Sequence, residues 1–284
     1  MEWIERLNSA INYIEEHISD NIDMDKVAKL ACCSTYHFQR MFAYMADVPL
    51  SEYIRRRRMS LAAVDLQDGR NKVIDISMKY GYDSPTAFHR AFKNIHGISP
   101  SQARADGISL IAYPPISFQI IIKGLSAMNY RIEKRESFRI IGISEPLEQE
   151  IEKNFTTVPH MWGKAARNGV ISKLASKMDG LILGLLGVSS CNEADNWRYY
   201  IGVESSKSLE GELEELIVPK ETWAVFTGEG SNQSIQELEK RIVTEWLPTS
   251  GYEYGDAPDI EVYLSADPEN AKYEVWIPVV KRED

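Results

Sequence analysis

Residues 74–104, IDISMKYGYDSPTAFHRAFKNIHGISPSQAR, contain two short periodic apolar segments on either side of a glycine turn. The first segment, Ile74 to Tyr80, predicts a short helix, and Gly81-Tyr82-Asp83 predicts a tight turn. The second segment, Ser84 to Ile95, predicts a longer helix, because its apolar residues recur three and four positions apart: Phe88, Ala91, Phe92 and Ile95. A helix, a tight turn and a second helix together predict a helix-turn-helix unit.

The same pattern occurs 50 residues earlier, in DMDKVAKLACCSTYHFQRMF, residues 23–42. At that offset five residues of the first unit are identical in the second: Lys29, Ser34, Phe38, Arg40 and Phe42 match Lys79, Ser84, Phe88, Arg90 and Phe92. The two stretches therefore predict an internal duplication of the helix-turn-helix unit.

Two further helices are predicted around the first unit. Residues 3–18 are amphipathic, with an isoleucine or leucine every three or four positions, and Asp23 and Asp25 are candidate caps for the helix that follows. After Pro49, residues 51–66 predict a long helix that joins the two units and ends at Asp68-Gly69.

The length and the charge distribution predict two domains of different character. The chain has 284 residues and a net charge of −10. Residues 33–104 hold 11 Lys and Arg against 6 Asp and Glu, whereas residues 111–284 hold 18 against 28. This asymmetry indicates a nucleic-acid-binding module joined to an acidic module.

Several classes of protein are not expected from the composition. The chain shows no apolar run of transmembrane length, and its first residues, MEWIERLN, do not resemble a signal peptide. Its three cysteines fit neither a disulfide framework nor a zinc site. We expect a cytoplasmic protein that has no membrane partner, no metal and no cofactor.

The outward sides of the two second helices carry the candidate DNA-binding residues. Two helix-turn-helix units separated by a rigid helix can enter successive major grooves, where Arg bridges guanine and Gln bridges adenine. The candidates in the first unit are Thr35, Tyr36, Gln39 and Arg40. Those in the second are Pro85, Thr86, His89, Arg90 and Lys93. Residues 55–58 are four consecutive arginines that point around the whole linking helix, so some of them must form internal ion pairs.

Both stretches resemble the two helix-turn-helix units of AraC/XylS-family transcription regulators, and the resemblance covers about residues 5–105. It rests on the glycine-tyrosine turn, the F-x-R-x-F helix and the terminal Gly97-Ile98-Ser99-Pro100. It implies an all-α DNA-binding domain over residues 1–107. Asp47 replaces a usual glycine of the family, and Pro85 and Ala87 replace commoner polar residues. The second helix is therefore expected to hold mainly phosphate.

After about residue 110 the periodicity changes to that of strands. Residues 116–123 and 130–144 are rich in β-branched and aromatic residues. Residues 130–144, 155–177, 181–189 and 197–204 predict one strand–helix–strand–strand module, and a second module is predicted at 213–228, 232–247, 258–265 and 272–280. We expect a connecting segment over 108–125 and an α+β domain over 126–284, with its two modules around a cleft.

No catalytic motif stands out in this half, whose sequence instead holds aromatic residues and carboxylates. Strand alternation in PDIEVY, residues 258–263, places Glu261 and Tyr263 on one face. Aligning the two modules pairs Tyr200 with Trp276, and if the modules pack about a pseudo-dyad these rings face each other across the cleft. Aromatic rings beside a carboxylate favour a small apolar or cationic ligand.

The second half resembles the GyrI-like effector-binding domain over about residues 112–281. The matching stretches include HMWGKAA (160–166), ETWAVFTGEG (221–230), PDIEVY (258–263) and YEVWIPV (273–279). The resemblance implies that Glu261 lies in the ligand cleft. By position and chemistry, the expected aromatic walls are Trp162, Tyr200, Trp223 and Trp276, together with Tyr263.

The two resemblances predict a bacterial transcription regulator, an activator by family habit. Its expected partners are double-stranded promoter DNA, a small-molecule effector and RNA polymerase. Two alternatives remain open at this stage. Some domains that resemble this half hydrolyse reactive small molecules, with a glutamate such as Glu261 as general base. Alternatively, the second half binds a protein partner and no ligand.

Overall fold

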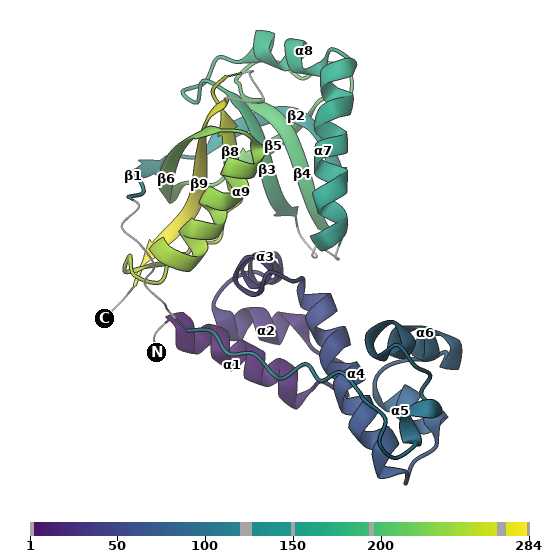
Figure 1. Ribbon diagram of the computed structural model, residues 1–284. Coiled ribbons are helices and arrows are strands. Elements are labelled where there is room, and N and C mark those ends of the chain that lie inside the picture. Colours follow the sequence, from purple (N-terminus) through teal and green to yellow (C-terminus); the bar gives the residue numbers. More distant parts are fainter. Residues whose placement is uncertain (1–2, 120–126, 149–150, 193–195, 266–270, 283–284) are drawn as a thin grey trace. The chain divides into compact units, whose positions relative to one another are not determined.

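A computed structural model describes residues 3–119, 127–148, 151–192, 196–265 and 271–282 (Figure 1). The chain divides into two compact units, residues 1–119 and residues 120–284. In the described ranges, no helix has both the length and the apolar composition needed to cross a membrane.

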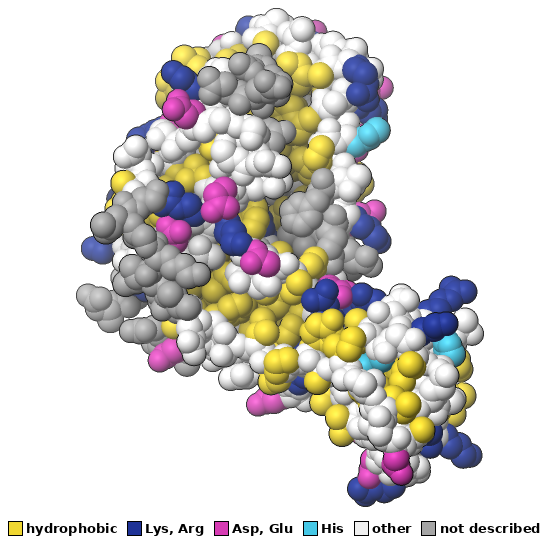
Figure 2. All heavy atoms as spheres, in the orientation of Figure 1, with side chains coloured by type: hydrophobic (Ala, Val, Ile, Leu, Met, Phe, Trp, Pro, Cys, Tyr) yellow, Lys and Arg dark blue, Asp and Glu magenta, His cyan; other side chains and the backbone are white. Residues whose placement is uncertain are grey.

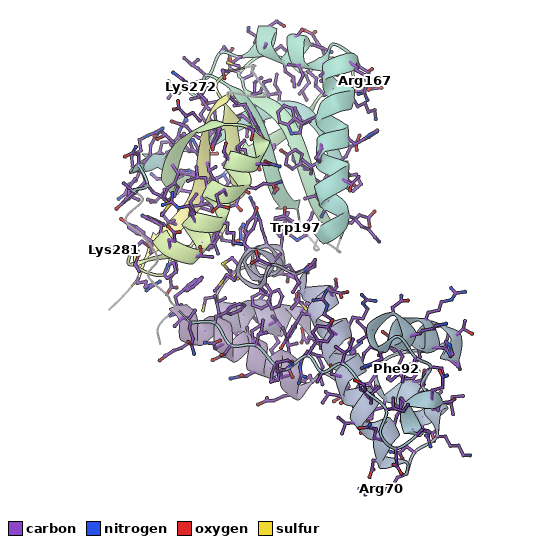
Figure 3. All side chains as sticks on the ribbon, viewed as in Figure 1. Arg70, Phe92, Arg167, Trp197, Lys272 and Lys281 are labelled. Atoms are coloured by element: carbon purple, nitrogen blue, oxygen red, sulfur yellow. The ribbon has the colours of Figure 1, made fainter. Side chains whose placement is uncertain are left out.

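The first unit is built of helices, as the periodicity predicts. They are α1 (Trp3–Glu16), α2 (Met24–Ala31), α3 (Thr35–Ala46), α4 (Leu50–Asp68), α5 (Val73–Lys79) and α6 (Pro85–His96), followed by a short 3-10 helix (Gln102–Arg104). The phenylalanines of both repeats are buried, and Phe92 lies between α6 and α5 in Figure 3. The expected duplication is thus α2–α3 and α5–α6, joined by α4.

The two second helices begin and end in the same way. Ser34 and Ser84 cap their N-termini, and each hydroxyl accepts a backbone N–H three residues on, from His37 and Ala87. Each helix has 12 residues and is followed by a residue in the left-handed region, Asp47 (φ 53°) or Gly97 (φ 76°). Asp47 takes the glycine conformation because a short polar side chain tolerates this region better than most others do.

The two turns differ by one residue. The left-handed residue is Cys32 (φ 54°) in the first unit and Gly81 (φ 78°) in the second, three and four residues before the next helix begins. A Cβ atom at Gly81 would lie 3.0 Å from Nη1 of Arg58 on α4. Glycine at this position therefore allows α4 to approach the turn of the second unit closely.

Residues 108–119 pack along the helices of the first unit. The backbone N–H of Ile111 donates to Nδ1 of His96, and that of Tyr113 donates to Oγ of Ser60. Near the other end, Asn8 on α1 accepts the N–H of Phe118 and donates to its carbonyl. Residues 116–119 do not form the strand expected at 116–123, because side chains of the helices, and not a neighbouring strand, bond to their backbone. Residues 120–123 lie outside the described ranges.

In the second unit, the described residues form a nine-stranded antiparallel sheet. Its strands are β1 (Tyr130–Arg135), β2 (Phe138–Pro146), β3 (Leu185–Asn192), β4 (Asn196–Glu204), β5 (Glu214–Val218), β6 (Glu221–Gly230), β7 (Tyr252–Tyr254), β8 (Asp259–Tyr263) and β9 (Ala271–Lys281). The order is β1-β6-β9-β8-β3-β4-β2-β5, with β7 paired to β9. The second module therefore meets the first where β8 pairs with β3.

The segments 130–144 and 213–228, each expected as one strand, are each two strands. β1 pairs with β6, and β2 pairs with β5 in the continuing register, so that Arg135 faces Glu221 and Phe138 faces Val218. The two ladders thus form one long ribbon interrupted at residues 136–137 and 219–220, where Lys220 pairs with Glu136 at 2.6 Å. Each module lends one strand to the other half of the sheet.

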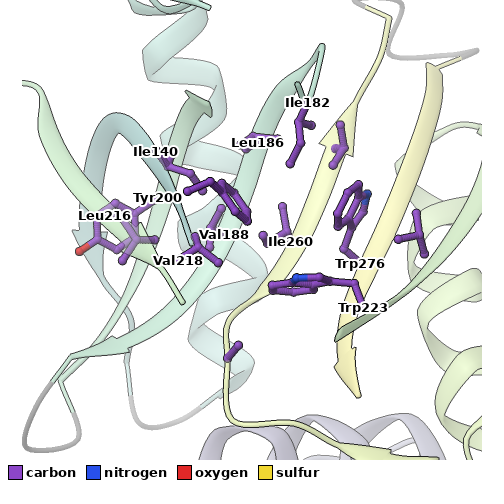
Figure 4. Packing of buried hydrophobic residues seen from close by; sticks show 14 residues of the cluster. Ile140, Ile182, Leu186, Val188, Tyr200, Leu216, Val218, Trp223, Ile260 and Trp276 are labelled. Carbon is purple, nitrogen blue, oxygen red and sulfur yellow. The ribbon is translucent and has the colours of Figure 1, made fainter. Parts of the chain in front are cut away.

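The helices of this unit lie on one face of the sheet (Figure 1). The helix expected over 155–177 is two helices, α7 (Ile151–Arg167) and α8 (Val170–Lys177), because Gly169 takes a left-handed conformation (φ 75°) between them. In the second module, α9 (Asn232–Arg241) continues into a π-helical turn (Ile242–Trp246). Figure 4 shows the buried apolar cluster on the opposite face.

Candidate DNA-binding and small-molecule sites

The candidate DNA-binding residues of the second unit share one exposed surface. The side chains on the outward side of α6 are all exposed: Pro85, Thr86, His89, Arg90 and Lys93. Figure 2 shows basic and histidine side chains gathered over this helix. The residues that face inward, such as Phe88 and Phe92, are fully buried. Helix α6 therefore presents the positive charge of Arg90 and Lys93 to solvent, while its inner side is buried.

The candidates of the first unit lie on α3 and are partly exposed: Thr35, Tyr36, Gln39 and Arg40. The guanidinium of Arg40 lies 5.7 Å from the ring centroid of Tyr44, one helical turn on. Its Nε lies 3.4 Å from the Tyr44 hydroxyl. Contact with Tyr44 restrains the arginine side chain along the helix surface.

Residues 55–58 form internal contacts, as their crowding on one helix predicts. Arg57 is buried and binds the carboxylate of Glu15 on α1, with Nη2 and Oε2 2.7 Å apart. Arg58 donates to the carbonyls of Ile18 and Asp20. Arg55 and Arg56 are more exposed, and both pair with Glu52. Arg57 and Arg58 therefore hold α4 against α1 and the residues that follow α1. Arg55 and Arg56 form ion pairs along the surface of α4 itself.

In the second unit of the chain, three aromatic side chains form a cluster with one carboxylate. Oε2 of Glu261 on β8 accepts hydrogen bonds from the hydroxyls of Tyr263, at 2.8 Å, and Tyr199, at 3.1 Å. Trp162 on α7 donates its indole N–H to the Tyr199 hydroxyl at 3.0 Å. The rings of Trp162 and Tyr263 meet edge to face, with centroids 4.9 Å apart. Strand β8 and helix α7 therefore bring Glu261, Tyr263 and Trp162 together, with Tyr199 of β4 between them.

The two tyrosines remain protonated donors. Burial raises the pKa of both phenols well above the ordinary value, and the negative charge of Glu261 raises each pKa further. Tyr199 is buried, while Glu261, Tyr263 and Trp162 are each partly exposed. The cluster therefore offers a carboxylate and aromatic rings at the edge of a buried network.

Gly187 on β3 makes the approach of Tyr199 to Glu261 possible. It is the register partner of Glu261, and a Cβ atom there would overlap the Tyr199 hydroxyl and lie 3.0 Å from Oε2 of Glu261. Only a residue without a side chain leaves this space. Neither Gly187 nor Tyr199 is among the sequence-predicted site residues.

The other three predicted ligand residues lie on the opposite face of the sheet. Tyr200, Trp223 and Trp276 are buried in the apolar cluster that also holds Ile260 and Val262 (Figure 4). The rings of Trp223 and Trp276 pack edge to face, 6.0 Å between centroids. The structure does not bring these rings to Glu261, because neighbouring residues of a strand point to opposite faces.

Two domain models match the chain at these two sites. Residues 128–280 match the GyrI-like small molecule binding domain, and residues 27–106 match a helix-turn-helix domain. The first match covers more than half of the chain. This protein belongs to the GyrI-like family and carries an AraC-type helix-turn-helix domain.

The chain is similar to a regulatory protein, to an origin-binding protein and to a solved complex with a small molecule. The regulatory protein SoxS of Salmonella typhimurium is 39% identical over 98 residues, which are 34% of this chain and 92% of SoxS. The right origin-binding protein of Escherichia coli is 24% identical over 289 residues, 94% of this chain and 95% of that protein. The solved structure of SAV2435 bound to tetraphenylphosphonium is 21% identical, with a TM-score of 0.48, and covers 54% of this chain and 94% of that one.

The GyrI-like protein is thus a transcription regulator with a DNA-binding half and a small-molecule-binding half.

Tyr199 was missed because strand alternation alone does not tell which of two adjacent tyrosines faces Glu261. The deciding signal is the strand register, in which β3 pairs Gly187 with both Glu261 and Ile201. Ile201 and Tyr199 are two positions apart and therefore share that face.

Proposed function

We propose that this regulator is an activator that binds promoter DNA in the bacterial cytoplasm, senses a small hydrophobic cation at Glu261 and contacts RNA polymerase. The observation that carries the ligand class is the Glu261 carboxylate beside the partly exposed rings of Trp162 and Tyr263. Aromatic faces and a carboxylate at a partly desolvated position stabilise a cation more than they stabilise a neutral molecule.

The DNA-binding part of the proposal assigns different roles to the two second helices. Arg40 and Gln39 on α3 carry the side-chain chemistry that reads guanine and adenine edges. Helix α6 begins with Pro85 and exposes Arg90 and Lys93, so it is suited to hold phosphate. A single chain then covers an asymmetric site without forming a dimer.

The small-molecule effector regulates DNA binding only if the effector and the DNA each bind one conformation of the chain more tightly than another. Residues 108–119 are the physical candidate for this coupling. Their backbone is hydrogen-bonded to α1, α4 and α6, and the chain continues from them toward the sheet unit.

The test is titration calorimetry of the full chain with tetraphenylphosphonium, with a neutral aromatic of similar size as the control ligand. We expect saturable binding of the cation, and we expect Glu261→Gln to weaken it about tenfold or more while leaving DNA affinity unchanged. Unchanged cation affinity in Glu261→Gln would remove this residue from the site.

The same titrations separate binding from catalysis. We infer that Glu261 binds rather than acts as a general base, since it accepts hydrogen bonds from two protonated tyrosines. The ligand recovered after incubation should be chemically unchanged by mass spectrometry. Turnover of reactive ester probes that disappears in Glu261→Gln would instead support a hydrolase.

A further inference from the structure

The last residue of α6, His96, joins three parts of the first unit. The residue is buried, with 6% of its surface exposed. Its Nε2 lies 3.1 Å from the carbonyl oxygen of Met59 on α4, and its Nδ1 lies 3.2 Å from the backbone nitrogen of Ile111. One side chain therefore ties the DNA-binding helix α6 both to α4 and to the connecting segment.

The two partners fix where the proton of His96 lies. A carbonyl oxygen can only accept a hydrogen bond, so Nε2 carries the hydrogen. A backbone N–H can only donate, so Nδ1 is the unprotonated nitrogen. His96 is thus neutral in this arrangement. A second proton would go to Nδ1, where it would face the N–H of Ile111 and remove the hydrogen bond to the segment.

The surroundings of His96 do not stabilise a positive charge. Helix α4 contacts it through Met59, the segment through Ile111, and α6 through the ring of Phe92, with ring centroids 4.2 Å apart. Residues 108–119 contain no charged residue. The charged and titratable residues of the two helices are Glu52, Tyr53, residues 55–58, Asp65 and Asp68 on α4, and His89, Arg90 and Lys93 on α6.

The three carboxylates among them have basic partners of their own. Glu52 pairs with Arg55, Asp65 with Lys79, and Asp68 with Arg70. The remaining charged groups of the two helices are basic and oppose a further positive charge. Burial lowers the pKa of His96 below its ordinary value, and the bond to the Met59 carbonyl raises it by a smaller amount.

The segment that His96 holds covers the core of the second helix-turn-helix unit. Leu110 and Tyr113 pack against the apolar cluster that contains Phe88 and Phe92 of α6. If the segment leaves, part of this cluster is exposed to water, which costs free energy in proportion to the apolar area. The packing that positions α6, the helix that presents Arg90 and Lys93, is then loosened.

We propose that His96 makes the docking of residues 108–113 sensitive to acid: protonation of its ring releases them from α4 and α6 and weakens the hold of α6 on DNA. The inference goes beyond the proposed function, since neither Glu261 nor a small molecule takes part in it.

The direction of the pH effect follows from linkage. When the segment leaves, the imidazole is exposed and its pKa returns toward the ordinary value of about 6.5. The released state then binds the extra proton more tightly, so docking has its full strength above that pH and weakens as the pH falls below it. For one proton, the docking constant falls by up to about tenfold between pH 7.5 and pH 5.5.

The test is amide hydrogen exchange of the full chain at these two pH values, with each rate divided by the intrinsic rate at that pH. We expect protection of the Ile111 amide to fall by about five- to tenfold in acid. The Phe118 amide is the internal control, because it donates to Oδ1 of Asn8, an amide oxygen that does not titrate. Its protection should stay the same within about twofold.

The matched variant is His96→Gln, because an amide side chain offers a donor and an acceptor and does not titrate. Protection of the Ile111 amide should be equal at both pH values in this variant. If it does not fold, nitrogen NMR of the wild-type imidazole replaces it and should find Nδ1 unprotonated at neutral pH. Unchanged Ile111 protection in acid, the same pH dependence in His96→Gln, or a proton on Nδ1 at neutral pH would overturn the inference.

Binding of random-sequence duplex DNA tests the effect on α6. The exposed His89 on the same helix also gains charge in acid, so the comparison is made in a His89→Gln background. We expect the affinity to fall by about threefold or more in acid, and His96→Gln added to this background should remove the change. A pH-independent affinity together with a loss of Ile111 protection would overturn the link to α6 and support the acid-sensitive docking alone.

Discussion

At the scale of single residues, the site around Glu261 depends on the absence of a side chain at Gly187. A methyl group there would overlap the Tyr199 hydroxyl, which binds both Glu261 and Trp162. We expect Gly187→Ala to displace Tyr199 and to destabilise the fold by about 1–3 kcal/mol, the usual cost of overpacking. Urea unfolding measures this loss, and cation affinity should fall in parallel.

A matched variant tests the cause of that loss. Tyr199→Phe removes the hydroxyl that the new methyl group would meet, so Gly187→Ala should cost less free energy of unfolding in the Tyr199→Phe background. Equal costs in both backgrounds would show that the close contact between Gly187 and Tyr199 is not the reason.

Two basic residues on the second helices predict different effects on DNA binding. Arg40→Ala should weaken binding to a cognate site by about 1–3 kcal/mol and relax the preference at one base position. Lys93→Ala should weaken cognate and random DNA alike and lower the salt dependence of binding, since the contact proposed for Lys93 is with a phosphate. Fluorescence anisotropy on both DNAs distinguishes the two, and an equal loss for Arg40→Ala on random DNA contradicts base reading.

At the scale of elements, α4 is held by a buried ion pair. Arg57 binds Glu15 on α1 and also donates to the carbonyl of Tyr113 in the connecting segment. Arg57→Ala leaves the largely buried Glu15 carboxylate with the hydrogen bond from the Tyr53 hydroxyl but without its positive counter-charge, so we expect a loss of about 3–5 kcal/mol of unfolding free energy. Thermal or urea unfolding of the full chain measures it.

The neighbouring Arg56 is the control for this prediction. It pairs with Glu52 on the helix surface, where an ion pair contributes at most about 1 kcal/mol. Arg56→Ala should therefore change the stability little. Similar losses in the Arg56 and Arg57 variants would show that burial of the Arg57 pair has no special weight.

At the scale of the whole molecule, a regulator must couple its two ligands. If a cation changes the affinity for DNA by some factor, DNA must change the affinity for the cation by the same factor. We expect the two factors to agree when DNA binding is measured with saturating cation and cation binding with saturating DNA. If neither ligand changes the affinity for the other, both factors equal one and the two halves of the chain bind independently. Residues 108–119 then do not couple the two halves.

The local features of the fold follow from the sequence because they depend on neighbours along the chain. The apolar spacing around Phe38 and Phe88, and the identical residues at an offset of 50, predict both helix-turn-helix units and their duplication. Helix periodicity and capping act within a few residues. Glu261 and Tyr263 are placed on one face for the same reason, since strand alternation is local.

Only the tertiary structure decided which distant residues join them. Adjacent tyrosines 199 and 200 have the same chemistry, but the pairing of β4 with β3 and of β3 with β8 brings Tyr199 to Glu261 and buries Tyr200 with Trp276 on the other face. A shift of one residue in register would exchange them. Register between strands depends on packing across the whole sheet, which no single stretch of sequence encodes.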